Sequence, residues 1–124
     1  MSILNTIKKL LGVCDDSFDL DIIACINTAI ISLIQIGVGP TEGFVVIDDT
    51  QTFEDFCGTN LQLESVKMYI YLKSKLMFDP PSNSNVTQTF EKSISEIEWR
   101  LNRSVETSNL TYPDLEEGDE DEQY

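Results

Sequence analysis

The chain has 124 residues, 41% of them hydrophobic, which is enough to bury one core but leaves no room for a second. Its formal net charge is -14, from 22 acidic and 8 basic residues, and it contains no histidine. This acidity argues against tight binding to nucleic-acid phosphates. Without histidine, catalytic triads and most metal sites lack their usual base or ligand.

The first predicted element is a short amphipathic helix over residues 3–11, which Gly12 is placed to end. Asp15, Asp16 and Ser17 predict a loop and an N-cap for a second helix, which runs to about residue 36. The apolar residues of this second helix are Leu20, Ile23, Ile26, Ile30, Leu33 and Ile34. So wide an apolar face predicts that it is the central helix of the fold.

Residues 37–58 predict a connection with little regular structure. Gly37, Gly39 and Pro40 end the second helix abruptly, and residues 44–47 favour an extended loop or a minor strand. Thr52 and Asp55 have the spacing of a capping box, which predicts one helical turn closed by Gly58.

Two further helices are predicted after this turn. One runs from about Leu61 to Phe78 and is ended by Pro80 and Pro81. The other begins at Asn85 and continues with clear amphipathic spacing through Leu101. The predicted fold class is all-α: a four-helix bundle-like subunit with a long loop or minor β segment between its second and third helices.

Charge divides the chain into two parts. Residues 105–124 contain eight carboxylates and neither lysine nor arginine, so residues 1–104 hold only -6 of the net charge of -14. An acidic segment with few apolar residues cannot offset the entropy of its own ordering. We therefore predict a helical domain over residues 1–103 and an extended acidic C-terminal tail over residues 104–124.

The acidic clusters within the helical domain do not have the spacing of a calcium loop. Residues 15–21 are interpreted as capping charges, and residues 48–55 as loop and cap charges. No catalytic, cofactor or metal site is predicted, and the chain is not expected to be an enzyme. A small enzyme that uses a carboxylate pair with Mg²⁺ remains an alternative.

The three cysteines, Cys14, Cys25 and Cys57, are odd in number and have no Cys-x-x-Cys spacing. They indicate a reduced, intracellular setting rather than a disulfide framework or a zinc site. The longest apolar stretch, residues 22–36, is interrupted by polar residues and falls short of the roughly 20 residues that span a bilayer. No membrane association is predicted.

Aromatic and basic residues give the best candidates for an interface. Trp99 lies close to Arg100 and Arg103, and it belongs either to the rim of the core or to a binding surface. Tyr71 falls outside the apolar rows of its helix. Candidates in or next to the acidic tail are Leu110, Tyr112, Leu115, Glu116 and Glu117.

The order of these elements resembles the head-to-tail connector (adaptor) proteins of tailed bacteriophages. The resemblance runs from about residue 3 to residue 103. It rests on Leu4-x-x-Ile7-Lys8-Lys9-Leu10-Leu11-Gly12, Gly37-Val38-Gly39-Pro40, the Phe53 and Phe56 turn, Phe78-Asp79-Pro80-Pro81, and Glu98-Trp99-Arg100-Leu101-Asn102.

The resemblance implies a structural virion protein without a cofactor. Such proteins form a homo-oligomeric ring of about twelve copies, between the portal protein and a stopper or tail-completion protein. Genomic DNA passes through the ring without specific binding, and assembly takes place in the bacterial host cytoplasm. The alternative function is an acidic DNA mimic that inhibits a nuclease or polymerase.

Overall fold

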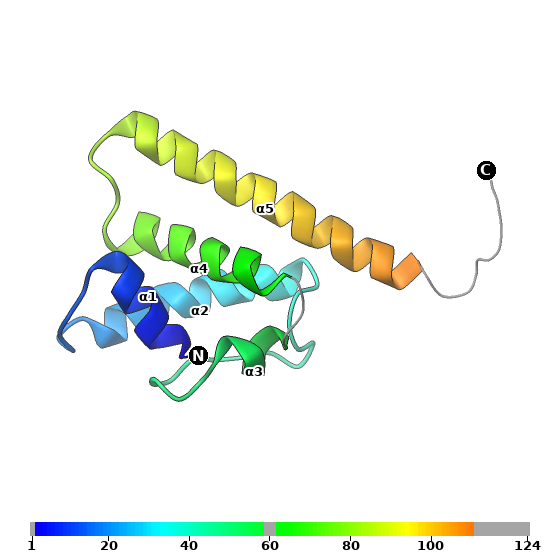
Figure 1. Ribbon diagram of the computed structural model, residues 1–124, viewed down its shortest axis with the longest axis horizontal. Coiled ribbons are helices and arrows are strands. Elements are labelled where there is room, and N and C mark those ends of the chain that lie inside the picture. The colour runs from blue at the N-terminus through cyan, green and yellow to red at the C-terminus, as the bar shows by residue number, and fades with distance from the viewer. Residues whose placement is uncertain (1, 59–61, 111–124) are drawn as a thin grey trace.

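The computed structural model describes residues 2–58 and 62–110, with the side chains described as far as Arg103. Within these residues the fold consists of five helices and no strand, as Figure 1 shows. The helices are α1 (Ile3–Leu11), α2 (Asp19–Gln35), α3 (Phe53–Cys57), α4 (Leu63–Phe78) and α5 (Ser84–Leu110). The predicted all-α class, with four main helices and one short turn, is confirmed.

Helix α1 begins and ends as its sequence predicts. The Ser2 side chain accepts a hydrogen bond of 3.2 Å from the backbone N–H of Asn5, and Gly12 ends the helix in a left-handed conformation with φ of 80°. Three of its apolar residues, Ile3, Leu4 and Ile7, are buried in the core, whereas Leu10 is exposed.

The centre of the fold is α4 rather than α2, which corrects the prediction. Helix α4 packs against each of the other four helices, whereas the main contacts of α2 are with α1 and α4. The start of α2 also differs from its prediction: Phe18 occupies the N-cap position, and no side chain caps the helix. Ser17 instead donates its backbone N–H to the Asp15 carboxylate at 3.0 Å.

The connection between α2 and α3 is an extended loop, and the alternative of a minor strand is wrong. Asn27 on α2 takes the place of a partner strand. Its side-chain oxygen accepts from the Val46 N–H at 2.8 Å, and its amide group donates to the Val46 carbonyl at 3.0 Å. Both backbone groups of the buried Val46 are thereby satisfied.

Helix α3 has the predicted capping box. Thr52 Oγ1 accepts from the Asp55 N–H at 2.9 Å, and Asp55 Oδ2 accepts from the Thr52 N–H at 3.1 Å. Phe53 and Phe56 are buried beneath this turn. The short helix therefore covers one end of the core.

Helix α5 is longer than its prediction. It begins at Ser84, where the Asn83 side chain accepts from the Asn85 N–H at 2.8 Å, and it ends at Leu110. It lies along α4, and its last part extends past the other helices in Figure 1. The predicted boundary between residues 103 and 104 thus falls within one continuous helix, and residues 111–124 lie outside the described part of the chain.

Candidate interaction surfaces

Metal-ligand groups, membrane-spanning helices and exposed surfaces are the features to consider among the described residues. No group of three or more potential ligands among them is placed to hold a metal ion. None of their helices has both the length and the apolar character needed to cross a membrane. Exposed apolar side chains and the charges around them are the features that indicate contact surfaces.

Two of the acidic residues at the start of α2, Asp16 and Asp19, form ion pairs, in addition to the position of Asp19 and Asp21 in its first turn. The nearly buried Lys8 Nζ of α1 lies 2.8 Å from Asp19 Oδ1 and 2.9 Å from Asp16 Oδ1. These hydrogen bonds, that of Asp19 before that of Asp16, raise the pKa of Lys8 above its usual value. Lys8 thus joins α1 to the start of α2.

The carboxylate of Asp48 is held by its own loop. It accepts from the Thr50 hydroxyl at 2.6 Å and from the Thr50 N–H at 2.9 Å. Hydrogen bonding to the hydroxyl and then to the backbone lowers the pKa of Asp48. This carboxylate therefore stays ionised at the surface of the loop.

Helix α5 is positioned by one polar contact within an otherwise apolar interface with α4. The hydroxyl of Tyr69, which is fully buried, donates to Glu98 Oε2 at 2.6 Å. Burial, and then the hydrogen bond to Glu98, raise the pKa of Tyr69 well above its usual value. Ile94 and Leu101 lie on the same side of α5 and are also buried.

The opposite side of α5 carries its three cations, Lys92, Arg100 and Arg103. Trp99 is 61% exposed, and the Arg103 guanidinium lies 5.3 Å from the centre of its ring. Arg100 Nη2 lies 3.4 Å from Glu96 Oε1. We call this surface the α5 basic face; its members are Lys92, Glu96, Trp99, Arg100 and Arg103, and all of them are exposed.

A second surface joins the start of α2 to the extended loop. Leu20, predicted to lie on the apolar core side of α2, is instead 82% exposed, and Ile47 is 68% exposed. Both line a hollow of about 340 Å³ together with carboxylates of the two segments. We call this the acidic-apolar surface; its members are Asp16, Asp19, Leu20, Ile47, Asp48 and Asp49, and Lys8 lines the same hollow in ion pairs with Asp16 and Asp19.

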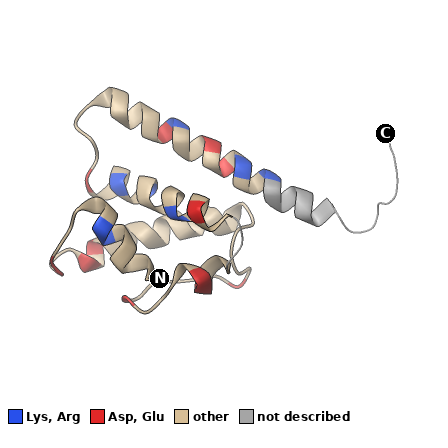
Figure 2. Cartoon of the chain, in the orientation of Figure 1, with Lys and Arg blue, Asp and Glu red and all other residues tan. Residues whose placement is uncertain are grey.

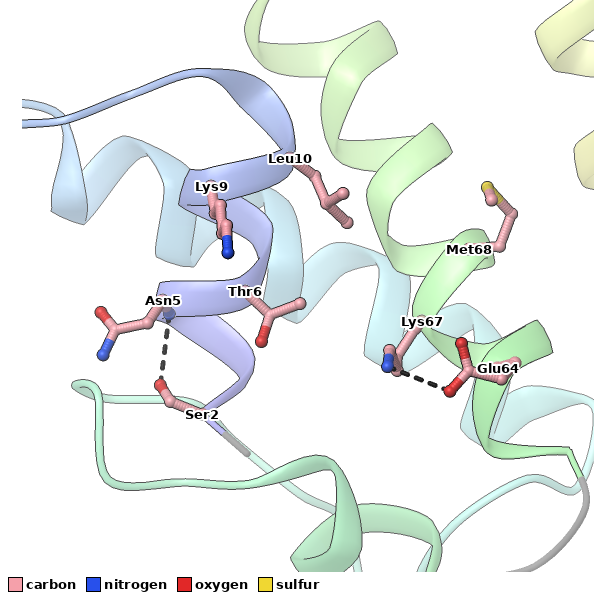
Figure 3. A pocket seen from close by; sticks show the side chains of 8 residues that line it. All are labelled: Ser2, Asn5, Thr6, Lys9, Leu10, Glu64, Lys67 and Met68. Atoms are coloured by element: carbon pink, nitrogen blue, oxygen red, sulfur yellow. Dashed lines mark hydrogen bonds and ion pairs between the residues drawn. The ribbon is translucent and has the colours of Figure 1, made fainter.

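A larger groove of about 640 Å³ lies between α1 and α4. Figure 3 shows Leu10 and Met68 on its two sides, with Lys9 on α1 and the Lys67–Glu64 ion pair on α4. The Lys67 Nζ lies 3.0 Å from Glu64 Oε2. The groove thus combines apolar walls with a mixture of charges.

A comparison with known protein families gives the context for these surfaces. A family model described as "Phage connector protein" matches residues 3–108, from α1 to the last turn of α5. The chain belongs to the phage connector protein family. No curated protein and no solved structure matches it. The resemblance to phage connectors, drawn above from the order of elements, is confirmed.

The structure brings some of the predicted interface residues of this phage connector together and separates others. Trp99, Arg100 and Arg103 share the α5 basic face, so Trp99 does not belong to the rim of the core. Tyr71 is half-buried and packs against the core. The side chain of Leu110, and Tyr112, Leu115, Glu116 and Glu117, lie outside the described residues.

The sequence search missed the acidic-apolar surface. Leu20 fits the helical period of the α2 core residues, and Ile47 belongs to a short apolar run, so each of them resembles a core residue. The only sequence signal is the high density of carboxylates beside both residues, at positions 15–21 and 48–49.

Proposed function

We propose that this phage connector protein is a head-to-tail adaptor: one subunit of a ring under the portal that joins the capsid to the tail. The observation that carries the proposal is the family match over residues 3–108, which includes all of α1 to α4 and most of α5. We propose about twelve copies in the ring, with the portal protein on one side and a stopper or tail-completion protein on the other. The protein acts as a structural component of the virion and not as an enzyme.

The net charge of -14 supports a position around the DNA channel. A lining rich in carboxylates repels the phosphate backbone, so DNA moves through the ring without adhering to it. Assembly of the ring in the bacterial host cytoplasm would then precede the passage of DNA.

The contact surface that we propose combines the α5 basic face with the acidic tail. Trp99 is the exposed aromatic residue of this face, and Trp and Arg are the residue types that most often dominate binding energy. In and next to the tail, Leu110, Tyr112 and Leu115 would act as apolar anchors, and Glu116 and Glu117 would meet basic residues of the portal or of a neighbouring subunit. Tyr71, half-buried against the core, would support the contact from α4.

Binding to purified portal protein tests this proposal. The full chain should form rings on the portal that are visible by electron microscopy and countable by native mass spectrometry. A chain without residues 111–124 should bind at least tenfold more weakly, because it lacks the proposed anchors. A chain with Glu116→Gln and Glu117→Gln keeps the length and the apolar anchors, so a smaller loss of binding in this variant measures the part that these two charges contribute.

Each result has its own consequence. Failure of the full chain to bind the portal would contradict the adaptor function. Undiminished binding of the shortened chain would leave that function intact and would remove the tail from the contact.

The alternative of a DNA mimic receives little support from the described surface. A mimic needs carboxylates spaced along one exposed face, as phosphates are along a duplex. Figure 2 shows that Lys and Arg interrupt the acidic residues along α5, the longest helix.

A further inference from the structure

The two most exposed apolar side chains of the described residues, Leu20 and Ile47, line the same hollow. Clustered exposed apolar residues on a small domain mark a contact surface more often than single ones do. Trp99 is similarly exposed, on a different helix. The chain therefore has two separate surfaces that could each bury apolar area against a partner.

The charges around these two surfaces have opposite signs. The acidic-apolar surface has four carboxylates. Lys8, in the same hollow, is paired with Asp16 and Asp19, whereas Asp48 and Asp49 form no ion pair with a described residue. The α5 basic face has three cations, Lys92, Arg100 and Arg103, against the single carboxylate of Glu96. Only Arg100 forms an ion pair with a described residue.

The two surfaces also lie far apart on the molecule. In Figure 1 the start of α2 and the loop before α3 lie toward the lower left, whereas the second half of α5 lies to the right. Figure 2 shows mostly red residues in the first region, beside blue ones on α1, whereas α5 carries both red and blue residues and blue ones at the end of its described part. Neither surface can therefore contact the other within one copy.

Complementary surfaces at different places on one chain produce head-to-tail contacts between copies, and such contacts close into a ring when the rotation between copies permits it. A symmetric dimer that buried either surface at its two-fold axis would place that surface against itself and oppose like charges. We infer that the α5 basic face of one copy docks on the acidic-apolar surface of the next, with Trp99 against Leu20 and Ile47. This inference rests on the proposed function, because the ring that these contacts would build is the ring proposed there.

Charge reversal with reciprocal rescue tests this pairing. One variant has Arg100→Glu and Arg103→Glu, and the other has Asp48→Asn and Asp49→Lys. Asparagine is chosen at position 48 because its side-chain oxygen can still accept the two hydrogen bonds from Thr50. All four positions are exposed, so both variants should fold, which circular dichroism and thermal melting would verify.

Self-association is measured by sedimentation velocity over a range of concentrations, alone and with purified portal as a template. Each variant alone should assemble at least tenfold more weakly than the unmodified chain, because it opposes like charges in every contact. An equal mixture of the two should recover assembly, since every contact in an alternating ring is then between opposite charges. Lys9→Glu, which reverses an exposed cation outside both surfaces, should assemble normally.

Several results would overturn the pairing. They are normal assembly of both variants, or a mixture that assembles no better than its components. A third is a chain that loses assembly when residues 111–124 are deleted but assembles normally with the changes at Asp48 and Asp49. The α5 basic face would then bind the acidic tail instead of the acidic-apolar surface.

Failure of the pairing and failure of the proposed function give different results. A chain that binds the portal as a ring but is insensitive to these charges would keep the function and lose the pairing. A chain that self-associates with reciprocal rescue but does not bind the portal would keep the pairing and lose the adaptor function.

Discussion

Tyr69 ties α5 to α4 through a polar contact. Its ring is buried in the core on α4, and its hydroxyl donates to Glu98 at 2.6 Å. A hydrogen bond to a carboxylate is stronger than one between neutral groups. The contact fixes which residue of α5 lies opposite which residue of α4.

Tyr69→Phe should lower the free energy of unfolding by about 1–2 kcal/mol, because it removes the donor and leaves Glu98 without this partner. Urea denaturation measures the change. Tyr71→Phe is the matched control, since Tyr71 is half-buried on the same helix and has no hydrogen bond through its hydroxyl among the described residues. An equal loss in both variants would contradict the role of the Tyr69–Glu98 bond.

The raised pKa of Tyr69 has a consequence for alkaline stability. Above its usual pKa of about 10, tyrosine loses its proton in the unfolded chain but keeps it in the folded one. The unfolded state then binds fewer protons, so stability should fall as the pH rises from about 9 to about 11. Lys8, whose pKa is also raised, acts in the same direction. Urea midpoints of Tyr69→Phe should fall less steeply over this range than those of the unmodified chain, and parallel curves would exclude a contribution from Tyr69.

Glycine is required at position 39 by the backbone conformation there and by the neighbouring side chain of Phe56. It has φ of +94°, and a Cβ atom there would lie 2.5 Å from a ring carbon of the buried Phe56. Gly39→Ala should therefore destabilise the protein by about 2–4 kcal/mol, through backbone strain and overpacking. Gly43→Ala is the control, because Gly43 also has positive φ but has open space around it. Similar losses of melting temperature in the two variants would show that the contact with Phe56 is unimportant.

At the scale of elements, α5 has one side for folding and another for contact. Leu101 lies on the side of α5 that faces the core and is 1% exposed, whereas Trp99, on the other side, is 61% exposed. Leu101→Ala should lower the free energy of unfolding by about 2–5 kcal/mol, and Trp99→Ala should change it by no more than about 0.5 kcal/mol. Denaturation of the two variants measures both effects. A large loss from Trp99→Ala would mean that this ring belongs to the core.

The elements themselves could be predicted because their signals are local. Helical spacing located α1, α2, α4 and α5, and the Thr52–Asp55 spacing identified the capping box of α3. Contacts between elements could not be predicted in this way. The Lys8–Asp19 ion pair and the exposure of Leu20 depend on how α1 and the α2–α3 loop pack against α2, which no spacing along one helix reports. Whether Trp99 lies at the rim of the core or on a binding surface could not be predicted for the same reason.

At the scale of the whole molecule, the buried core lies between Ile3 and Leu101. Deletion of residues 111–124 removes seven carboxylates and reduces the net charge to -7, but it removes none of these core residues. The free energy of unfolding should therefore change by no more than about 0.5 kcal/mol, as thermal melting of the shortened chain would show. A marked loss of stability would mean that the acidic residues take part in the fold itself.

The continuity of α5 sets the direction in which the chain leaves the fold. The Tyr69–Glu98 bond fixes the rotation of the helix, and the helix then continues without a break for twelve residues to Leu110. Each residue inserted after Arg103, beyond the buried Leu101, would turn the end of the helix by about 100° and advance it by about 1.5 Å. An insertion of seven residues would restore the original direction to within about 20°, some 10 Å farther out. Helix α5 thus determines the position and the direction in which the described part of the chain ends at Leu110.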